Sequence, residues 1–231
     1  MKLKRQKGLT LVELVVAISI GMIVLGSIYS MVLTGLRSSS SLEMKVTAGQ
    51  DVRAALELMA MEIRMASYNP TFVSGLWKDA TGAVSSHQNY RGIQSATQNS
   101  ILVEMDIQGN SDVEDSNEII AYSLDTINKY ITRRTGTAGI AQPFLGADPA
   151  QVDQERTVRV INSDLNIPIF TYFDGNGAAI PYTGLPGSIP KIRRIQIVLV
   201  VETDDLDINT HLRKRIIYST SVIPRNHASF S

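Results

Sequence analysis

Few side chains in this sequence have the types and spacing that chemistry at a site requires. The three histidines, His87, His211 and His227, are far apart and none has the spacing of metal ligands. The chain has no cysteine, which excludes thiol catalysis and disulfides. It also lacks the G-x-x-x-x-G-K-[ST] phosphate loop and the G-x-S-x-G nucleophile elbow. We therefore expect no enzyme and no cofactor, and exposed loop positions for the histidines.

An acidic run from residue 106 to residue 118 offers the hard oxygen ligands that Ca²⁺ prefers, placed around a glycine. The D-x-[DN]-x-[DN]-G order of an EF-hand loop is absent. A solvated hairpin loop between two strands explains the same residues, so a calcium loop remains the alternative interpretation. Its candidate ligands are Asp106, Asn110, Asp112, Glu114 and Asp115.

One carboxylate, Glu13, stands at the start of an otherwise apolar stretch. The stretch from Leu14 to Leu36 has no charged side chain. It is long enough to cross a bilayer as a helix, which needs about 20 predominantly apolar residues. An ionisable group in such a segment is costly, so Glu13 indicates a function. The basic residues before it, Lys2, Lys4, Arg5 and Lys7, predict a cytoplasmic start and export of everything after Leu36.

Two ordinary segments could also begin a chain in this way. A secretory signal peptide has a shorter apolar core and a small-residue cleavage site, which residues 33–36 match poorly. A plain membrane anchor explains the apolar run and its basic flank. It does not explain why a glutamate lies five residues after Gly8 and is followed by unbroken apolar sequence.

The string KGLTLVELVVAISIGMIVLGSIYS resembles the N-terminus of type IV prepilins and type II secretion pseudopilins. The resemblance implies that a prepilin peptidase cuts after Gly8 and methylates the new N-terminus, Leu9. It also implies that Glu13, at mature position five, serves filament assembly by meeting the amine of a neighbouring subunit. A buried charge needs such a partner. The family usually has phenylalanine where this chain has Leu9.

The composition argues against nucleic-acid binding. Without the four basic residues before Gly8, 18 basic side chains face 22 acidic ones, a net charge of −4. Nucleic-acid binding needs a concentrated basic face instead.

The next elements are predicted from periodicity. One helical face carries Leu42, Val46, Leu56, Met59 and Ile63, and we expect Met61 and Met65 to pack in the core as well. Asn69-Pro70 should end the helix. Side chains expected to face away from the core are Arg53, Glu57, Glu62 and Arg64.

Beyond residue 70 the pattern becomes that of strands separated by turns. We read 71–98 and 135–155 as long surface loops, because they are rich in small and polar residues. The predicted fold is α+β: a long N-terminal helix, transmembrane and then amphipathic, packed on an antiparallel β-rich globular domain. The expected strands are 101–107, 118–124, 129–134, 157–161, 167–173, 192–201 and 215–222.

The predicted organisation is a cleaved leader (1–8), a transmembrane or filament-core helix (9–36), an amphipathic helix (37–69) and a globular domain (70–231). RAALELMAMEIRMASYNP, residues 53–70, resembles the helix end of PilW-type minor pilins and of the GspJ pseudopilin. The ending SVIPRN, residues 221–226, is similar to that of the same proteins.

The resemblance implies a minor pilin that initiates or caps a type IV pilus in a tip or priming complex. Expected partners are other minor pilins, the major pilin, the prepilin peptidase and the inner-membrane assembly platform. The chain would cross the inner membrane once, with a periplasmic domain that reaches the cell surface in the pilus. Alternatives are a GspJ-like pseudopilin of type II secretion and, in another class, a membrane-anchored adhesin or DNA-uptake receptor.

Overall fold

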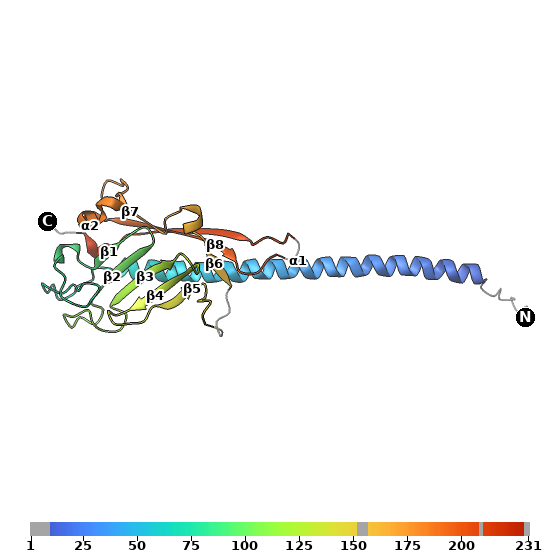
Figure 1. Ribbon diagram of the computed structural model, residues 1–231, viewed down its shortest axis with the longest axis horizontal. Helices are drawn as coiled ribbons and strands as arrows, with labels where there is room; N and C mark the ends of the chain where they lie inside the picture. Colours follow the sequence, from blue (N-terminus) through green and yellow to red (C-terminus); the bar gives the residue numbers. More distant parts are fainter. Residues whose placement is uncertain (1–9, 152–156, 208–209, 229–231) are drawn as a thin grey trace, which may run out of the picture.

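A long helix projects from one end of a domain built of two antiparallel sheets (Figure 1). The computed structural model describes residues 10–151, 157–207 and 210–228. Helix α1 runs from Leu11 to Met65, and the domain surrounds only its C-terminal half. This architecture confirms the predicted α+β class.

Helix α1 has a clear start and a clear end. Thr10 caps the N-terminus with its side chain, and Ala66 leaves helical geometry at φ −48°, ψ 139°. Ser67 then takes a left-handed backbone conformation, with φ 68°. The helix therefore ends at Met65, four residues before the Asn69-Pro70 stop that the sequence predicted, because the chain turns back to pair with the sheet. The Ser67 N–H donates to the Glu104 carbonyl at 2.8 Å.

The first sheet is a five-stranded antiparallel meander in the order β1-β2-β3-β4-β5. A tight turn joins the third and fourth strands, where the Asp125 carboxylate accepts the N–H groups of Ile127 and Asn128 at 2.9 and 2.8 Å. The strands are β1 (Ile93–Ala96), β2 (Ser100–Glu104), β3 (Ile119–Asp125), β4 (Tyr130–Thr135) and β5 (Gln142–Leu145).

The second sheet is organised around β8 (Arg194–Thr203). Two short strands, β6 (Val158–Val160) and β7 (Phe170–Phe173), pair with the two ends of β8 on one side. The strand β9 (Arg215–Val222) pairs with nearly the whole of β8 on the other side. Short helices complete the domain: α2 (Leu185–Ser188), η1 (Gln88–Tyr90), η2 (Ser163–Leu165), η3 (Tyr182–Gly184), η4 (Ile189–Lys191) and η5 (Arg225–His227).

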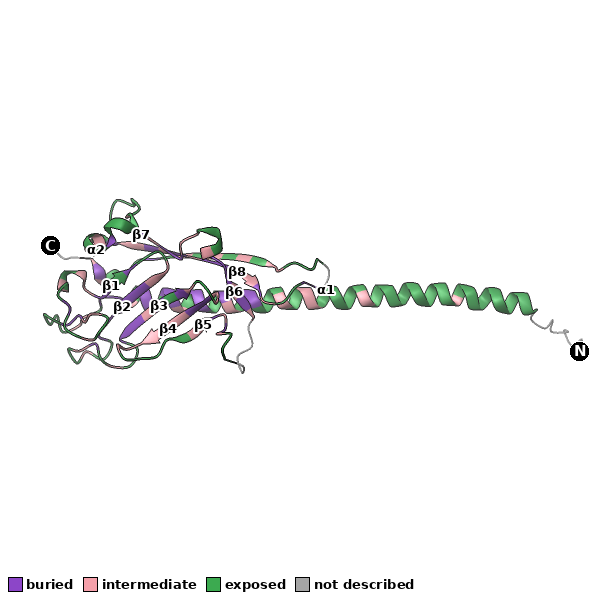
Figure 2. Cartoon of the chain, viewed as in Figure 1, coloured by how far each residue is buried: buried purple, intermediate pink, exposed green. Residues whose placement is uncertain are grey.

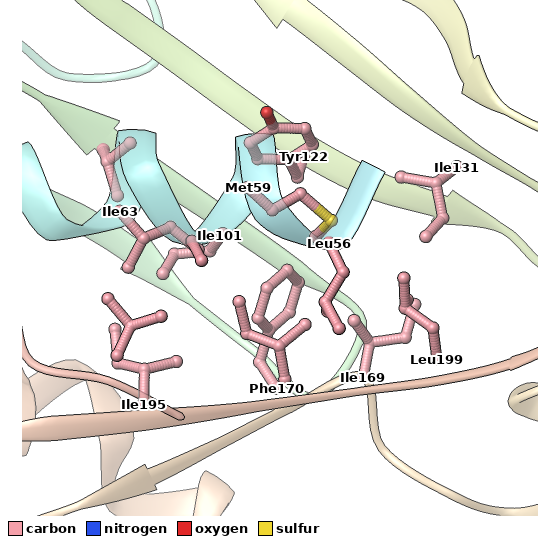
Figure 3. Packing of buried hydrophobic residues seen from close by; sticks show 14 of the residues in the cluster. Leu56, Met59, Ile63, Ile101, Tyr122, Ile131, Ile169, Phe170, Ile195 and Leu199 are labelled. Atoms are coloured by element: carbon pink, nitrogen blue, oxygen red, sulfur yellow. The ribbon is translucent and has the colours of Figure 1, made fainter. Parts of the chain in front are cut away.

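The main core forms where α1 meets both sheets (Figure 3). Met59 and Ile63 of α1 are fully buried, and side chains of the two sheets close around them. Burial of large apolar side chains of this kind stabilises a fold by about 1.5–3 kcal/mol each. The labelled partners from the sheets and their connections are Ile101, Tyr122, Ile131, Ile169, Phe170, Ile195 and Leu199.

The predicted apolar face of α1 is correct only in its C-terminal part. Leu56, Met59 and Ile63 are buried, whereas Leu42 and Val46 are exposed because the domain covers little of α1 before Ala48. Met61 is also exposed, so only Met59 and Met65 of the three methionines pack on the core. Glu62, expected to face solvent, is buried and paired with charged and polar groups of the first sheet.

The two segments interpreted as surface loops each contain a strand. The first includes β1, and the second includes β5. Neither strand has apolar alternation, and β5 contains Pro143, which is compatible with an edge position. Leu76 and Trp77 of the first segment are also buried, against the face of β2 and β3 that points away from α1. The segment Leu185-Pro186-Gly187 begins the short helix α2.

Candidate functional site

The start of α1 is held by a reciprocal pair between Thr10 and Glu13. The Glu13 N–H donates to the Thr10 hydroxyl oxygen at 3.2 Å. The Glu13 carboxylate in turn accepts the Thr10 N–H at 2.8 Å and the Thr10 hydroxyl at 2.9 Å. This capping box fixes Glu13 in the first helical turn, where two of the helix's unpaired N–H groups find acceptors. Both hydrogen bonds that the Glu13 carboxylate accepts come from Thr10, and no cation among the described residues pairs with it.

Apolar side chains follow Glu13 on every side of the helix, and they face outward (Figure 2). The stretch from Leu11 to Leu36 is about 39 Å long at 1.5 Å per residue, more than the ~30 Å hydrocarbon core of a bilayer. Three of its hydroxyl groups bond within the helix: Ser19, Ser27 and Thr34 each donate to the carbonyl four residues earlier, at 2.8–2.9 Å. By length and composition this part of α1 can span a membrane.

Gly8 and Leu9, the residues of the expected cleavage and methylation, lie outside the described residues. Both residues nevertheless fall within a stretch of sequence that matches a known family. Residues 3–29 match the family described as the prokaryotic N-terminal methylation motif. That motif here heads an exposed apolar helix whose other half is packed in a two-sheet domain.

In this motif and this architecture the chain resembles type IV pilins. Among solved structures it is similar to a type IV-like pilin from Thermus thermophilus, with 12% identity, a TM-score of 0.41, and coverage of 78% of this chain and 98% of that one. The resemblance to type IV pilins rests on the motif and the observed architecture. No curated protein sequence matches the chain.

The acidic run of this pilin-like chain is built into its own loop. The buried Asp106 carboxylate accepts the N–H groups of Gly109, Asn110 and Ser111 at 2.5, 3.2 and 3.1 Å. Asp112 accepts two further N–H groups, and Asn110 donates to Asp115. No group of three or more metal-ligating side chains forms within the described ranges. The geometry therefore gives the calcium hypothesis no support.

The histidines do not share one environment. His87 and His211 are exposed, as predicted, and His87 stacks on Tyr90 with ring centroids 4.6 Å apart. The prediction was wrong for His227, which is buried. Its Nδ1 lies 2.8 Å from the Ser67 hydroxyl and its Nε2 lies 2.8 Å from the Ile189 carbonyl. Burial lowers the pKa of His227 to about 4, so it is a neutral structural group that ties the C-terminal turn to the end of α1.

A charged network that the sequence did not predict joins α1 to the first sheet. Arg133 of β4 donates to both carboxylate oxygens of Glu62, at 2.6 Å from Nη2 and 3.2 Å from Nε. The Tyr122 hydroxyl of β3 donates to the same carboxylate, and burial raises the pKa of Tyr122. A glutamate between Met59 and Ile63, next to a buried helix face, was the only sequence signal for this network.

A second buried carboxylate, Glu104, lies at the end of β2. One carboxylate oxygen accepts the Lys78 N–H at 2.9 Å, while Oε1 has no hydrogen-bond partner within the described part of the chain. Burial raises the pKa of Glu104 to about 8. The group is therefore largely protonated at neutral pH. Its position on the loop-covered face of the sheet, away from α1, indicates a structural role.

Proposed function

We propose that this protein is a minor pilin that initiates or caps a type IV pilus as part of a tip or priming complex. The observation that carries the proposal is the methylation motif on an apolar helix that has no covering partner within the described chain. Such a surface must be covered by lipid or by other apolar helices. An exported domain on a membrane-inserted helix that can pass into a filament core meets this need.

In the assembled state Glu13 is the group that needs a partner. The Thr10 groups supply hydrogen bonds but no positive charge. A methylated amine on Leu9 of a neighbouring subunit would supply that charge in the low-dielectric bundle. A subunit at the very top has no neighbour above it, so the retained Glu13 favours a place just beneath the top.

A GspJ-like pseudopilin in a type II secretion system is the second candidate. The region 53–70, similar to both protein types, supports it equally. The lack of cysteine and the Arg225-Asn226 ending favour the pilus. Normal secretion with lost piliation after deletion of the gene would support the first candidate, and the reverse result would support the second.

The proposal is tested by processing and by assembly. Mass analysis of the chain from native membranes should find it to begin at a methylated Leu9, and an intact Met1 would contradict the proposal. In the same membranes, Glu13→Ala should leave export intact but weaken co-purification with the other minor subunits. Loss of one partner of a buried ion pair costs about 3–5 kcal/mol. Undiminished recovery and normal piliation would make Glu13 a plain membrane-surface carboxylate; Glu43→Ala, on the exposed part of the same helix, is the control.

A further inference from the structure

Strand β9 leaves one long sheet edge open. It pairs with β8 over eight residues, from Arg215 to Val222, without a register shift. Among the described residues β8 is the only strand with which it pairs. An edge of this kind is a template for another strand, because its outer backbone groups have no partner.

The hydrogen bonds around β8 show which backbone groups of β9 point outward. The Thr203 N–H donates to the Lys214 carbonyl at 3.0 Å, so the two residues form a hydrogen-bonded pair. In every second pair after it, the backbone groups of β9 likewise point toward β8. On the opposite side of β8, the Val198 N–H donates to Ile169, which fits the same alternation. The residues whose N–H and C=O groups point away from β8 are therefore Arg215, Ile217, Ser219 and Ser221. No hydrogen bond to these backbone groups occurs within the described ranges.

The other outer strands are protected against pairing, and β9 is not. On the first sheet, β1 has four residues and a register irregularity, and β5 contains Pro143 and a register shift. On the second sheet, β6 and β7 have only three and four residues. Short length, bulges and proline are the usual devices that block edge pairing. Strand β9 has none of them, and Arg215 at its start is its only charged residue.

The open edge runs beside an exposed face of α1. Arg53, Glu57, Met61 and Arg64 line a groove together with residues 218–220 of β9. Met61, at the middle of this face, is 52% exposed. A strand added to β9 would lie over this helix face and cover Met61. Its side chains toward α1 would meet an apolar centre flanked by two arginines.

We propose that the outer edge of β9 receives an extended strand from a different, co-assembled subunit. This proposal rests on the assembly function argued above. The strand pairs its backbone with residues 215–221, places an apolar side chain on Met61, and carries an acidic side chain near Arg53 or Arg64. Backbone pairing of this type gives affinity, and the alternate side chains give specificity.

A second copy of the chain does not fit this edge. Strand β9 and α1 run in the same direction: Ser41 contacts Asp207, Arg53 lies over Tyr218, and Ser67 contacts His227. Antiparallel pairing of two β9 strands about a two-fold axis would thus point the two α1 helices in opposite directions. Their apolar segments could not then enter one membrane. A copy in the same orientation would have to offer one of the protected edges, or pair its β9 in parallel, which is less stable per residue than antiparallel pairing.

Full-length protein in native membranes, with a photoreactive benzoylphenylalanine at Met61, tests the proposal. Irradiation should join this position to one extended segment of another subunit, identified by mass spectrometry. Ser219→Pro removes an outward N–H that no group of the chain uses, so it should lower the cross-linked yield about tenfold, the effect of losing ~1.4 kcal/mol. Ser219→Ala keeps the N–H and should leave the yield unchanged.

A second variant guards against a folding defect. Ile217→Lys leaves the backbone intact and places a charge on the edge, so it should also reduce the yield while the unfolding midpoint stays constant. Equal yields in the Pro, Lys and Ala variants, or cross-linked peptides from a second copy of this chain, would overturn the proposal. Methylation of Leu9, read in the same samples, reports on the assembly function separately.

Discussion

Two buried ionisable residues, Glu104 and His227, give the domain opposite responses to pH. The folded-state pKa of Glu104 is raised from 4.5 to about 8 by burial, so between these values the unfolded state loses a proton that the folded state keeps. Its contribution to stability is full below pH 4.5 and declines as the pH rises toward 8. The folded-state pKa of His227 is lowered from 6.5 to about 4 by burial. Its contribution is full above pH 6.5 and declines as the pH falls toward 4.

We predict that Glu104→Gln removes the loss of stability on the alkaline side. Between pH 6.5 and 8 only Glu104 of this pair still titrates, and the free energy of unfolding of the wild type should fall by about 2 kcal/mol. The variant should lack this decline, because an amide has no proton to lose. Urea unfolding at the two pH values measures both proteins.

Glu57→Gln, at an exposed carboxylate on α1, serves as the control and should follow the wild type. If the free energy of unfolding fell equally with pH in the wild type and in Glu104→Gln, Glu104 would already be ionised in the folded state.

At the scale of elements, the attachment of α1 to the first sheet combines apolar packing with one ionic contact. The helix inserts Leu56, Met59 and Ile63 into the core, and Glu62 meets Arg133 and Tyr122 on adjacent strands. Packing is non-directional, whereas the two-pronged contact between Arg133 and Glu62 fixes how the helix is rotated against the sheet. The pair is largely buried, so removing one partner leaves the other without compensation.

We predict that Arg133→Gln lowers the free energy of unfolding by about 3 kcal/mol, because the Glu62 carboxylate loses its cation. Glu62→Gln with Arg133→Gln should cost less than the sum of the single changes, with a coupling of about 1–3 kcal/mol. A double-mutant cycle from urea unfolding measures this coupling.

The neighbouring Arg134, which donates to the Gly136 and Thr137 carbonyls of its own loop, is the matched control. Additive effects of Glu62→Gln and Arg133→Gln on the free energy of unfolding would contradict a coupled pair.

At the scale of the whole molecule, the chain divides into a part that folds around a core and a part whose surface is left for its surroundings. The exposed apolar half of α1 lies beyond the domain (Figure 2). Contacts between α1 and the second sheet begin near Ser41, which donates to the Asp207 carboxylate. The globular domain thus gains little stability from the exposed apolar residues of α1.

We predict that residues 37–231 form a soluble domain whose unfolding midpoint lies within about 4 °C of that of the full chain in detergent, a difference of about 1 kcal/mol. The physical reason is that the removed residues from Thr10 to Leu36, the described part of the deleted segment, bury nothing in the domain. Circular dichroism of the truncated protein should show both helix and strand. A purely helical spectrum, or aggregation at neutral pH, would contradict the prediction.

The sequence by itself determined the features that depend on local pattern. The basic head, the uninterrupted apolar run and the placement of Glu13 after Gly8 predicted the pilin-like start, and the methylation motif at residues 3–29 confirms it. Runs rich in β-branched and aromatic residues between turn signals also located β3, β4, β8 and β9 to within two residues, because such side chains fit a pleated, half-buried surface.

Only the tertiary structure decided the features that depend on which surfaces meet. The weakly patterned β1 and β5 become strands because neighbours supply their hydrogen bonds. Glu62, Glu104 and His227 are buried because distant segments close over them, and no local spacing records such a closure. The exposure of Leu42 and Val46 has the same cause: a helix pattern marks an apolar face, but only the fold determines how far along the helix that face is covered.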